Sequence, residues 1–163
     1  MLKRKNSIAY HTQAPRVPDL DAFQRSYIRQ ALWTSNDAYN HPLDLNHDIM
    51  ELPLETIQAL KSDCVQFRSS AAVDELLKAA YELRRYGDEQ AGGDYWLTRN
   101  DNDVAGFWDQ NLGVIGESLT TLARAMGPRS LVLTPQGQIE VSWPRAPLES
   151  PQARPTVEIP ERS

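Results

Sequence analysis

Carboxylate and amide side chains able to bind a cation concentrate in the segment 44–55. Its positions 1, 3, 5 and 12 carry the oxygen-bearing side chains of Asp44, Asn46, Asp48 and Glu55. Helix–loop–helix calcium sites have this spacing, but their sixth position is a glycine that permits a sharp turn, and here it is Ile49. Glu55 beside Pro53 is explained equally well by the start of a helix. We therefore predict that the segment does not bind calcium tightly.

Two of the three histidines lie in or beside the same segment. His41 and His47, with Asp44 and Asp48, could bind a transition metal, because imidazole and carboxylate are both ligands for such ions. Solvated side chains in a polar loop are the competing interpretation. We assign no metal and no cofactor, and the possibility of a metal at 44–55 stays open from the sequence.

A second group of polar side chains lies among aromatic residues farther along the chain. The candidate partner-binding residues are Arg99, Asn100, Asp101, Asn102, Asp103 and Asp109. Arg99 could form a structural ion pair or contact a carboxylate or phosphate of a partner, since guanidinium binds both. The carboxylates of Asp101, Asp103 and Asp109 could bind Mg²⁺. Asn and Asp in a tight turn also have a sufficient local cause, because they bond their own main chain.

No arrangement of residue types identifies a catalytic site. His11, His41 and His47 are the only histidines, and neither a G-x-S-x-G turn nor a Walker loop occurs. We name no catalytic residue. A metal-dependent hydrolase or nucleotide-processing enzyme, using carboxylates of the turn 100–103 or the segment 44–55, is the enzymatic alternative.

The polar group around Arg99 needs a scaffold, and the segment 95–108 predicts a β-hairpin. Aromatic and β-branched residues come first, Asn and Asp supply a turn at 100–103, and the chain returns to Trp108. Trp96 and Trp108 have the apolar area to anchor this hairpin in the core. Arg99 and the turn would then face outward as a recognition edge.

Apolar residues recur at spacings of three and four in four other segments, which predicts amphipathic helices. These helices are expected at about 19–34, 53–68, 72–86 and 112–126. Asp19 is expected as the N-cap of the first. Alternating residues at 130–134 and 139–143, around a Pro–Gln–Gly turn, predict a second hairpin. The fold class is α+β: N-terminal helices, then hairpin, helix and hairpin, with a small antiparallel sheet.

The composition indicates one globular domain. The 163 residues are 40% hydrophobic and 24% charged, which suits a single core. We expect this domain at 19–144, between a flexible basic arm at 1–18 and a disordered Pro-rich tail at 145–163. No apolar run could span a membrane or serve as a signal peptide. Cys64 is expected to be a buried core residue, and the chain to work in a reducing cytoplasm.

The charge is unevenly distributed along the chain. The formal net charge is −5, yet residues 1–18 carry four Lys or Arg and no Asp or Glu. The remaining chain is therefore acidic, which argues against a broad surface for nucleic-acid phosphates. Contact with nucleic acid is expected only through 1–18. An acidic surface that imitates DNA charge and acidity that serves solubility alone both stay open.

Three stretches resemble a family of small, mostly uncharacterised proteins of tailed bacteriophages and prophages. Residues 91–109 are similar to the family segment A-G-H-D-F-W-L-T-R-N-G-H-G-A-G-F-W-D, and residues 23–37 to F-x-x-x-Y-I-x-x-A-L-W-S-S-x-D. A third match covers 112–127. Here the turn is one residue longer, and Gly93 and, most nearly, Asn102 replace the family's two histidines. Any metal-binding or proton-transfer role of those histidines is therefore not carried over to this chain.

The resemblance implies a function in phage biology. We expect a non-enzymatic accessory protein, encoded by a phage or prophage, that binds a host or phage protein. A bacterial defence or transcription component is one such partner. No association with a membrane is expected.

Overall fold

The computed structural model of the protein describes residues 19–83 and 85–142. The domain expected at 19–144 falls almost entirely within this range. The basic arm predicted at 1–18 and the tail predicted at 145–163 lie outside the described residues.

Five α-helices and one two-stranded antiparallel sheet form the described part of the chain, which confirms the α+β class. The helices are α1 (Ala22–Thr34), α2 (Leu54–Arg68), α3 (Ala71–Leu83), α4 (Asp88–Arg99) and α5 (Val114–Ala125). The strands are β1 (Ser130–Leu133) and β2 (Ile139–Ser142), and short 3-10 helices cover Leu43–Leu45, Ile49–Glu51 and Phe107–Asp109. All helices except α4 begin and end within about three residues of the predicted bounds.

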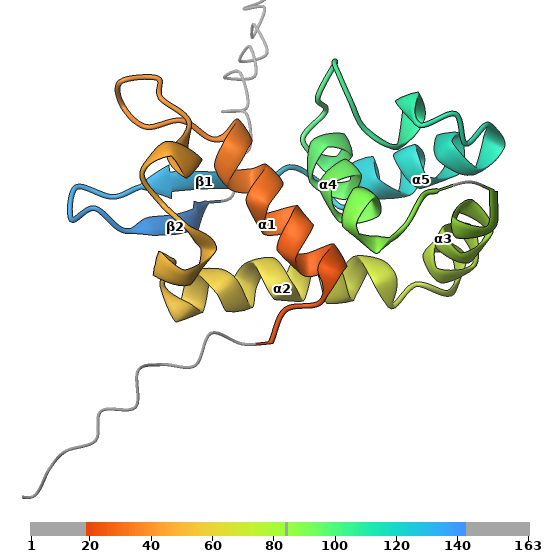
Figure 1. Ribbon diagram of the computed structural model, residues 1–163, viewed down its shortest axis with the longest axis horizontal. Helices are drawn as coiled ribbons and strands as arrows, with labels where there is room; N and C mark the ends of the chain where they lie inside the picture. Colours follow the sequence, from red (N-terminus) through yellow and green to blue (C-terminus); the bar gives the residue numbers. More distant parts are fainter. Residues whose placement is uncertain (1–18, 84, 143–163) are drawn as a thin grey trace, which may run out of the picture.

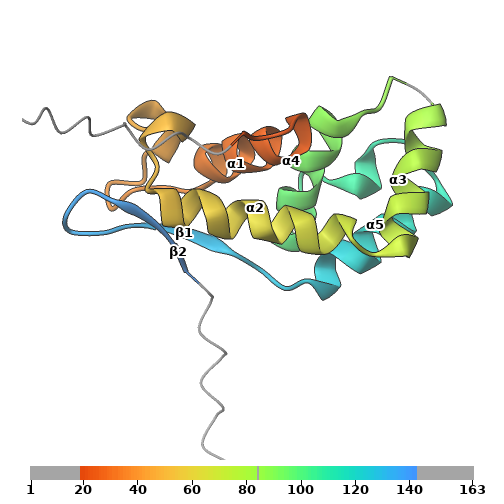
Figure 2. The ribbon, with the colours of Figure 1, turned by 90° about the horizontal axis from the view of Figure 1, so that it is seen from below.

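Helices α3 and α5 lie at the end of the molecule opposite the hairpin. Figure 1 shows α1 crossing α2 near the centre, with β1 and β2 at one end and α3 and α5 at the other. The same arrangement is visible from below in Figure 2. Between these ends, α4 packs against both α1 and α5. Its central place explains why every residue from 91 to 99 is buried.

The prediction of a β-hairpin at 95–108 is wrong, because α4 occupies the place of its first strand. A helix that is buried on all sides has no polar face, so its sequence lacks the helical period. The aromatic residues at 95–98 then favour a strand. Gly92 has a packing role in α4: a Cβ atom there would overlap the main-chain oxygen of Phe23 in α1. This glycine therefore permits the close approach of the two helices.

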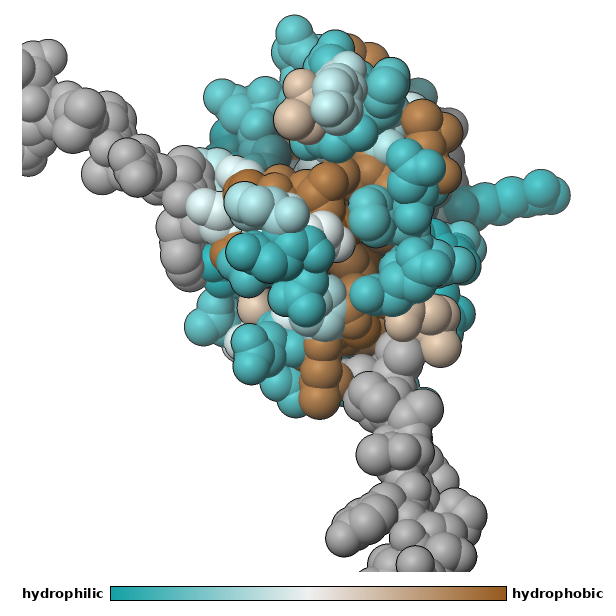
Figure 3. Space-filling model, turned by 90° about the vertical axis from the view of Figure 1, so that its left-hand side faces the viewer, coloured by the Kyte–Doolittle hydropathy of each residue, from teal (hydrophilic) through white to brown (hydrophobic). Residues whose placement is uncertain are grey.

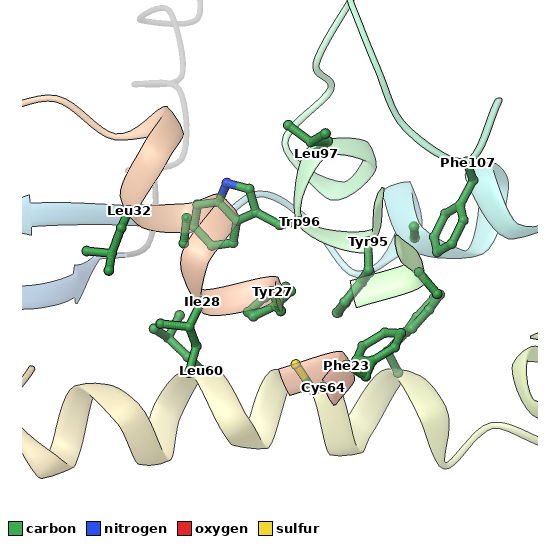
Figure 4. Close-up of a cluster of buried hydrophobic side chains, with 14 of the residues drawn as sticks. Phe23, Tyr27, Ile28, Leu32, Leu60, Cys64, Tyr95, Trp96, Leu97 and Phe107 are labelled. Atoms are coloured by element: carbon green, nitrogen blue, oxygen red, sulfur yellow. The ribbon is translucent and has the colours of Figure 1, made fainter. Parts of the chain in front are cut away.

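Aromatic rings from α1, α2 and α4 form the centre of the core (Figure 4). The ring of Tyr95 stacks on that of Phe67, with centroids 4.0 Å apart, and on that of Tyr27 at 5.1 Å. Trp96 meets the Tyr27 ring edge-on at 5.2 Å. Such ring pairs stabilise a core beyond the area that they bury. Cys64 is buried in the same core, as predicted.

Trp108 lies outside this core, so the prediction that it anchors the fold is wrong. It is 44% exposed, whereas its neighbour Phe107 is fully buried. After Arg99 the chain turns into a short 3-10 helix and does not run back as a strand. The two tryptophans of this stretch, Trp96 and Trp108, therefore have different environments.

A reciprocal cap begins α1. The Asp21 carboxylate accepts a hydrogen bond of 2.7 Å from the Gln24 main-chain N–H. The Gln24 side-chain oxygen accepts one of 3.1 Å from the Asp21 N–H. This capping box satisfies two donors at the helix start. It places the N-cap at Asp21, two residues after the predicted Asp19.

The second hairpin is present where it was predicted. β1 and β2 pair in antiparallel register, with Leu133 opposite Ile139. Gly137 in the connecting turn has a φ of 79°, a left-handed conformation that glycine adopts readily. The Thr56 hydroxyl of α2 donates a 2.7 Å hydrogen bond to the Ile139 main-chain oxygen. This bond links β2 to α2.

Candidate binding groove

Arg99 is not on the surface, so the predicted outward recognition edge is wrong for this residue. Only 3% of it is exposed. Its Nη1 lies 3.3 Å from Oδ2 of Asp63, and both side chains are buried. Arg99 also donates from Nε to the Gly127 main-chain oxygen at 2.8 Å and from Nη2 to that of Met126 at 3.2 Å. The guanidinium thus joins α4 to the end of α5.

Asp63 is the centre of this buried polar network. Arg129 binds it with two nitrogens, at distances from 2.6 to 3.1 Å. Tyr27 donates its hydroxyl to the same carboxylate at 3.1 Å and accepts from Arg99 at 2.9 Å. Burial raises the pKa of the Tyr27 hydroxyl well above its ordinary value, so it stays a donor. The network connects α1, α2, α4 and the start of β1, and all its members have structural partners.

The polar residues after Arg99 mostly bond the chain around them. Asn100 donates to the main-chain oxygen of Trp96 and accepts from the Arg129 N–H. The Asn102 side-chain oxygen accepts two main-chain N–H bonds within the turn. These amides have the local role that Asn commonly has in turns.

The three aspartates of this stretch are exposed and do not form one site. Asp101 pairs with Arg124 of α5 at 3.1 Å. Asp109 accepts the Gly106 N–H and a Gln110 side-chain N–H. Asp103 lies between them in sequence. Over residues 19–83 and 85–142, no group of three or more His, Cys, Asp or Glu could hold a metal ion.

The acids of segment 44–55 are likewise separated. Asp44 and Asp48 line a groove beside α1, whereas Glu55 lines a different hollow beside β2. The residues that have the spacing of a calcium loop therefore do not line one hollow. A hydrolase using both segments would need these acids to converge with Asp101 or Asp103, and no such group of three or more occurs among the described residues.

A groove lies beside α1 in the described part of the chain. It has a volume of about 780 Å³ and lies between α1 and the segment 44–51. Its α1 wall presents Ser26, Arg29, Gln30, Leu32 and Trp33. The facing wall presents Asp44, Leu45, Asn46, His47, Asp48, Ile49 and Glu51. Ligand sites in proteins have volumes of this order.

The α1 wall carries hydrogen-bond donors that the fold does not use. Within residues 19–83 and 85–142, the Arg29 side chain forms neither a hydrogen bond nor an ion pair. The amide nitrogen of Gln30 is buried, and no described residue accepts its hydrogen bond. A buried donor without a partner costs stability. The Arg29 side chain is therefore available to a ligand in the groove, whereas the Gln30 nitrogen has no exposed surface.

The facing wall carries acceptors. Asp44, Asp48 and Glu51 line it, and none of the three forms an ion pair with a described residue. Glu51 accepts the Asp48 N–H at 3.3 Å, which helps to fix the short 3-10 helix Ile49–Glu51. Arg29 lines the same groove but lies beyond salt-bridge distance of these carboxylates. The groove therefore has a donor wall and an acceptor wall.

Large apolar side chains line both walls of the groove. Trp33 is 60% exposed and Leu45 is 67% exposed. The groove continues through Arg29 and Asp48 into a second hollow of about 430 Å³, where Met50 is exposed. On the end of the molecule formed by the hairpin and the segment 35–53, hydrophobic residues lie in a band between hydrophilic ones (Figure 3).

A separate buried carboxylate lies between α4 and the segment after it. Asp94 is 4% exposed, and it accepts the Tyr86 hydroxyl at 2.8 Å and a Gln110 side-chain N–H at 3.2 Å. Burial raises the pKa of Asp94 to about 6, Asp109 adds to the increase, and the two hydrogen bonds oppose it. Asp94 therefore titrates within the range of ordinary buffers.

The sequence pointed to one wall of the groove only, since Asp44 and Asp48 were named as possible metal ligands. It did not place them opposite α1. The signal for the groove would have been Trp33, a large ring on the polar face of a helix whose apolar residues otherwise follow a regular spacing.

No helix in the described residues is long and apolar enough to cross a membrane. No family model, curated protein or solved structure matches the chain.

Proposed function

We propose that this protein is a non-enzymatic accessory protein, of the kind that phages and prophages encode, which binds a host or phage protein through the groove beside α1. The observation that supports binding at this place is the unpaired Arg29 beside the exposed ring of Trp33. Arg and Trp are the side chains that most often supply the binding energy of protein interfaces.

The structural roles of polar residues in the family-like stretch 91–109 also favour a binding protein over an enzyme. Its polar residues serve the fold: Asp94 and Arg99 are buried with partners, and Asn100 and Asn102 close the turn. A hydrolase would need its carboxylates together in a cleft, and those of the described residues are dispersed. The phage assignment is supported by the resemblance of 91–109 and 23–37 alone.

The test compares two exposed tryptophans. Tagged full-length protein and its Trp33→Ala and Trp108→Ala variants would be used to capture partners from a bacterial host lysate, with mass spectrometry as the readout. We expect the partner to be lost with Trp33→Ala and kept with Trp108→Ala, because only Trp33 lines the groove. Thermal melting of both variants would confirm that each remains folded.

Equal capture by all three proteins would contradict the assignment of the groove. Loss of the partner only with Trp108→Ala would place the binding surface on the segment 101–109 instead. In that case the recognition surface would be the exposed turn predicted from the sequence, and the buried Arg99 would not be part of it.

A further inference from the structure

We infer that the groove binds an extended segment of a partner protein that is rich in Lys or Arg. This inference rests on the proposed function, since it names the chemistry of the partner for the same site. It follows from the opposite hydrogen-bonding character of the two walls and from the charge of the segment that forms one of them.

The acceptor wall belongs to a segment without any positive charge. Residues 35–55 contain five Asp or Glu and no Lys or Arg. Three of these acids, Asp44, Asp48 and Glu51, line the groove. Because none of them forms an ion pair with a described residue, their negative charge is not neutralised within the fold and acts on the groove. Such a charge attracts a cationic segment and fixes its register.

The donor wall suits the main chain of the same segment. An extended peptide presents carbonyl oxygens along its length, and each can accept a hydrogen bond. The Gln30 amide nitrogen is buried in this wall without a partner, and the Arg29 guanidinium beside it is unpaired. A main-chain carbonyl or terminal carboxylate of the segment would satisfy Arg29, which is the accessible donor of this wall.

Trp33 and Leu45 suit the side chains of a basic segment. A Lys or Arg placed over the exposed Trp33 ring gains a cation–π contact. The aliphatic stem of such a residue can cover Leu45 while its charge reaches the carboxylates. Nucleic acid does not fit, because three carboxylates on one wall would repel its phosphates.

The experiment uses two labelled synthetic peptides of equal length, one alternating arginine with alanine and one alternating glutamate with alanine. Fluorescence anisotropy with the full chain gives each affinity. We expect binding of the arginine peptide only, weakened by salt. The double variant Asp44→Asn/Asp48→Asn should weaken it by about tenfold or more, since two facing charges are removed. The matched control Asp101→Asn/Asp103→Asn removes the same charge elsewhere and should change it less than about twofold.

Equal losses in the two double variants would overturn the inference, because binding would then follow net charge alone. Binding of the glutamate peptide or of a single-stranded oligonucleotide in the groove would also overturn it. If the lysate partner depends on Trp33 while the arginine peptide does not bind, the inference fails and the proposed function stands. If neither partner nor peptide depends on the groove, both fail.

Discussion

Replacement of Arg99 by methionine tests the buried network most directly. Methionine keeps much of the side-chain volume, so the change removes hydrogen bonds and charge with little cavity. Arg99 donates to the main-chain oxygens of Met126 and Gly127 and to the hydroxyls of Tyr27 and Tyr95. Arg99→Met leaves all four groups with one donor fewer.

The expected loss of unfolding free energy is about 3–4 kcal/mol. Removal of one member of a buried ion pair generally costs about 3–5 kcal/mol, because the other charge stays buried without compensation. Here the carboxylate of Asp63 keeps the two-nitrogen contact with Arg129, so the lower part of that range applies. Since domains are stable by about 5–15 kcal/mol, the variant should still fold.

The assay is chemical denaturation of the full chain, followed by circular dichroism. Arg124→Met is the matched control, because Arg124 pairs with Asp101 on the surface with both side chains more than half exposed. That control should lose no more than about 1 kcal/mol, as is usual for exposed pairs. Equal midpoints for Arg99→Met and Arg124→Met would refute the structural role of Arg99 and restore the possibility that it serves binding.

Three further substitutions have expected outcomes. Gly92→Ala should lower the melting temperature by several degrees, because its Cβ atom overlaps the Phe23 main chain; an unchanged melting temperature would mean that α1 and α4 can separate freely. Asp94→Asn should gain roughly 2–3 kcal/mol of unfolding free energy relative to the parent between pH 4 and 7. The parent carboxyl, with its raised pKa of about 6, stabilises the fold only while protonated, and that contribution is lost as pH rises through 6. A difference in unfolding free energy between variant and parent that stays constant from pH 4 to 7 would contradict the raised pKa. Trp108→Ala should cost less than about 2 kcal/mol, since the ring is 44% exposed, and a larger loss in denaturation would show that the ring is packed.

The helices that were predicted from the sequence are each buried on one face only. α1, α2, α3 and α5 each have a buried face and a solvated face, and this leaves a period in the sequence that can be read directly. The hairpin of β1 and β2 was found from a different signal, the glycine that its turn needs at 137.

The central helix could not be found in this way. Every residue from 91 to 99 is buried, so α4 has no polar face to reveal its period. Gly92 favoured a turn when read locally, whereas the structure uses it for close packing on α1. The burial of Arg99 depends on Asp63 and on the end of α5, which are distant in sequence. Nothing local distinguishes such an arginine from one on the surface.

The central position of α4 has a consequence for synthesis of the chain on the ribosome. The apolar face of α1 packs on a helix that ends at Arg99, so it has no native partner when Thr34 is made. At about 5–20 residues per second, the stretch between Thr34 and Arg99 takes roughly 3–13 seconds to synthesise. During that interval Phe23, Tyr27 and Ile28 form an unburied stripe that a chaperone can recognise. Late arrival of α4, whose residues 88–99 lie just past the middle of the chain, therefore makes this segment decisive for nascent-chain solubility.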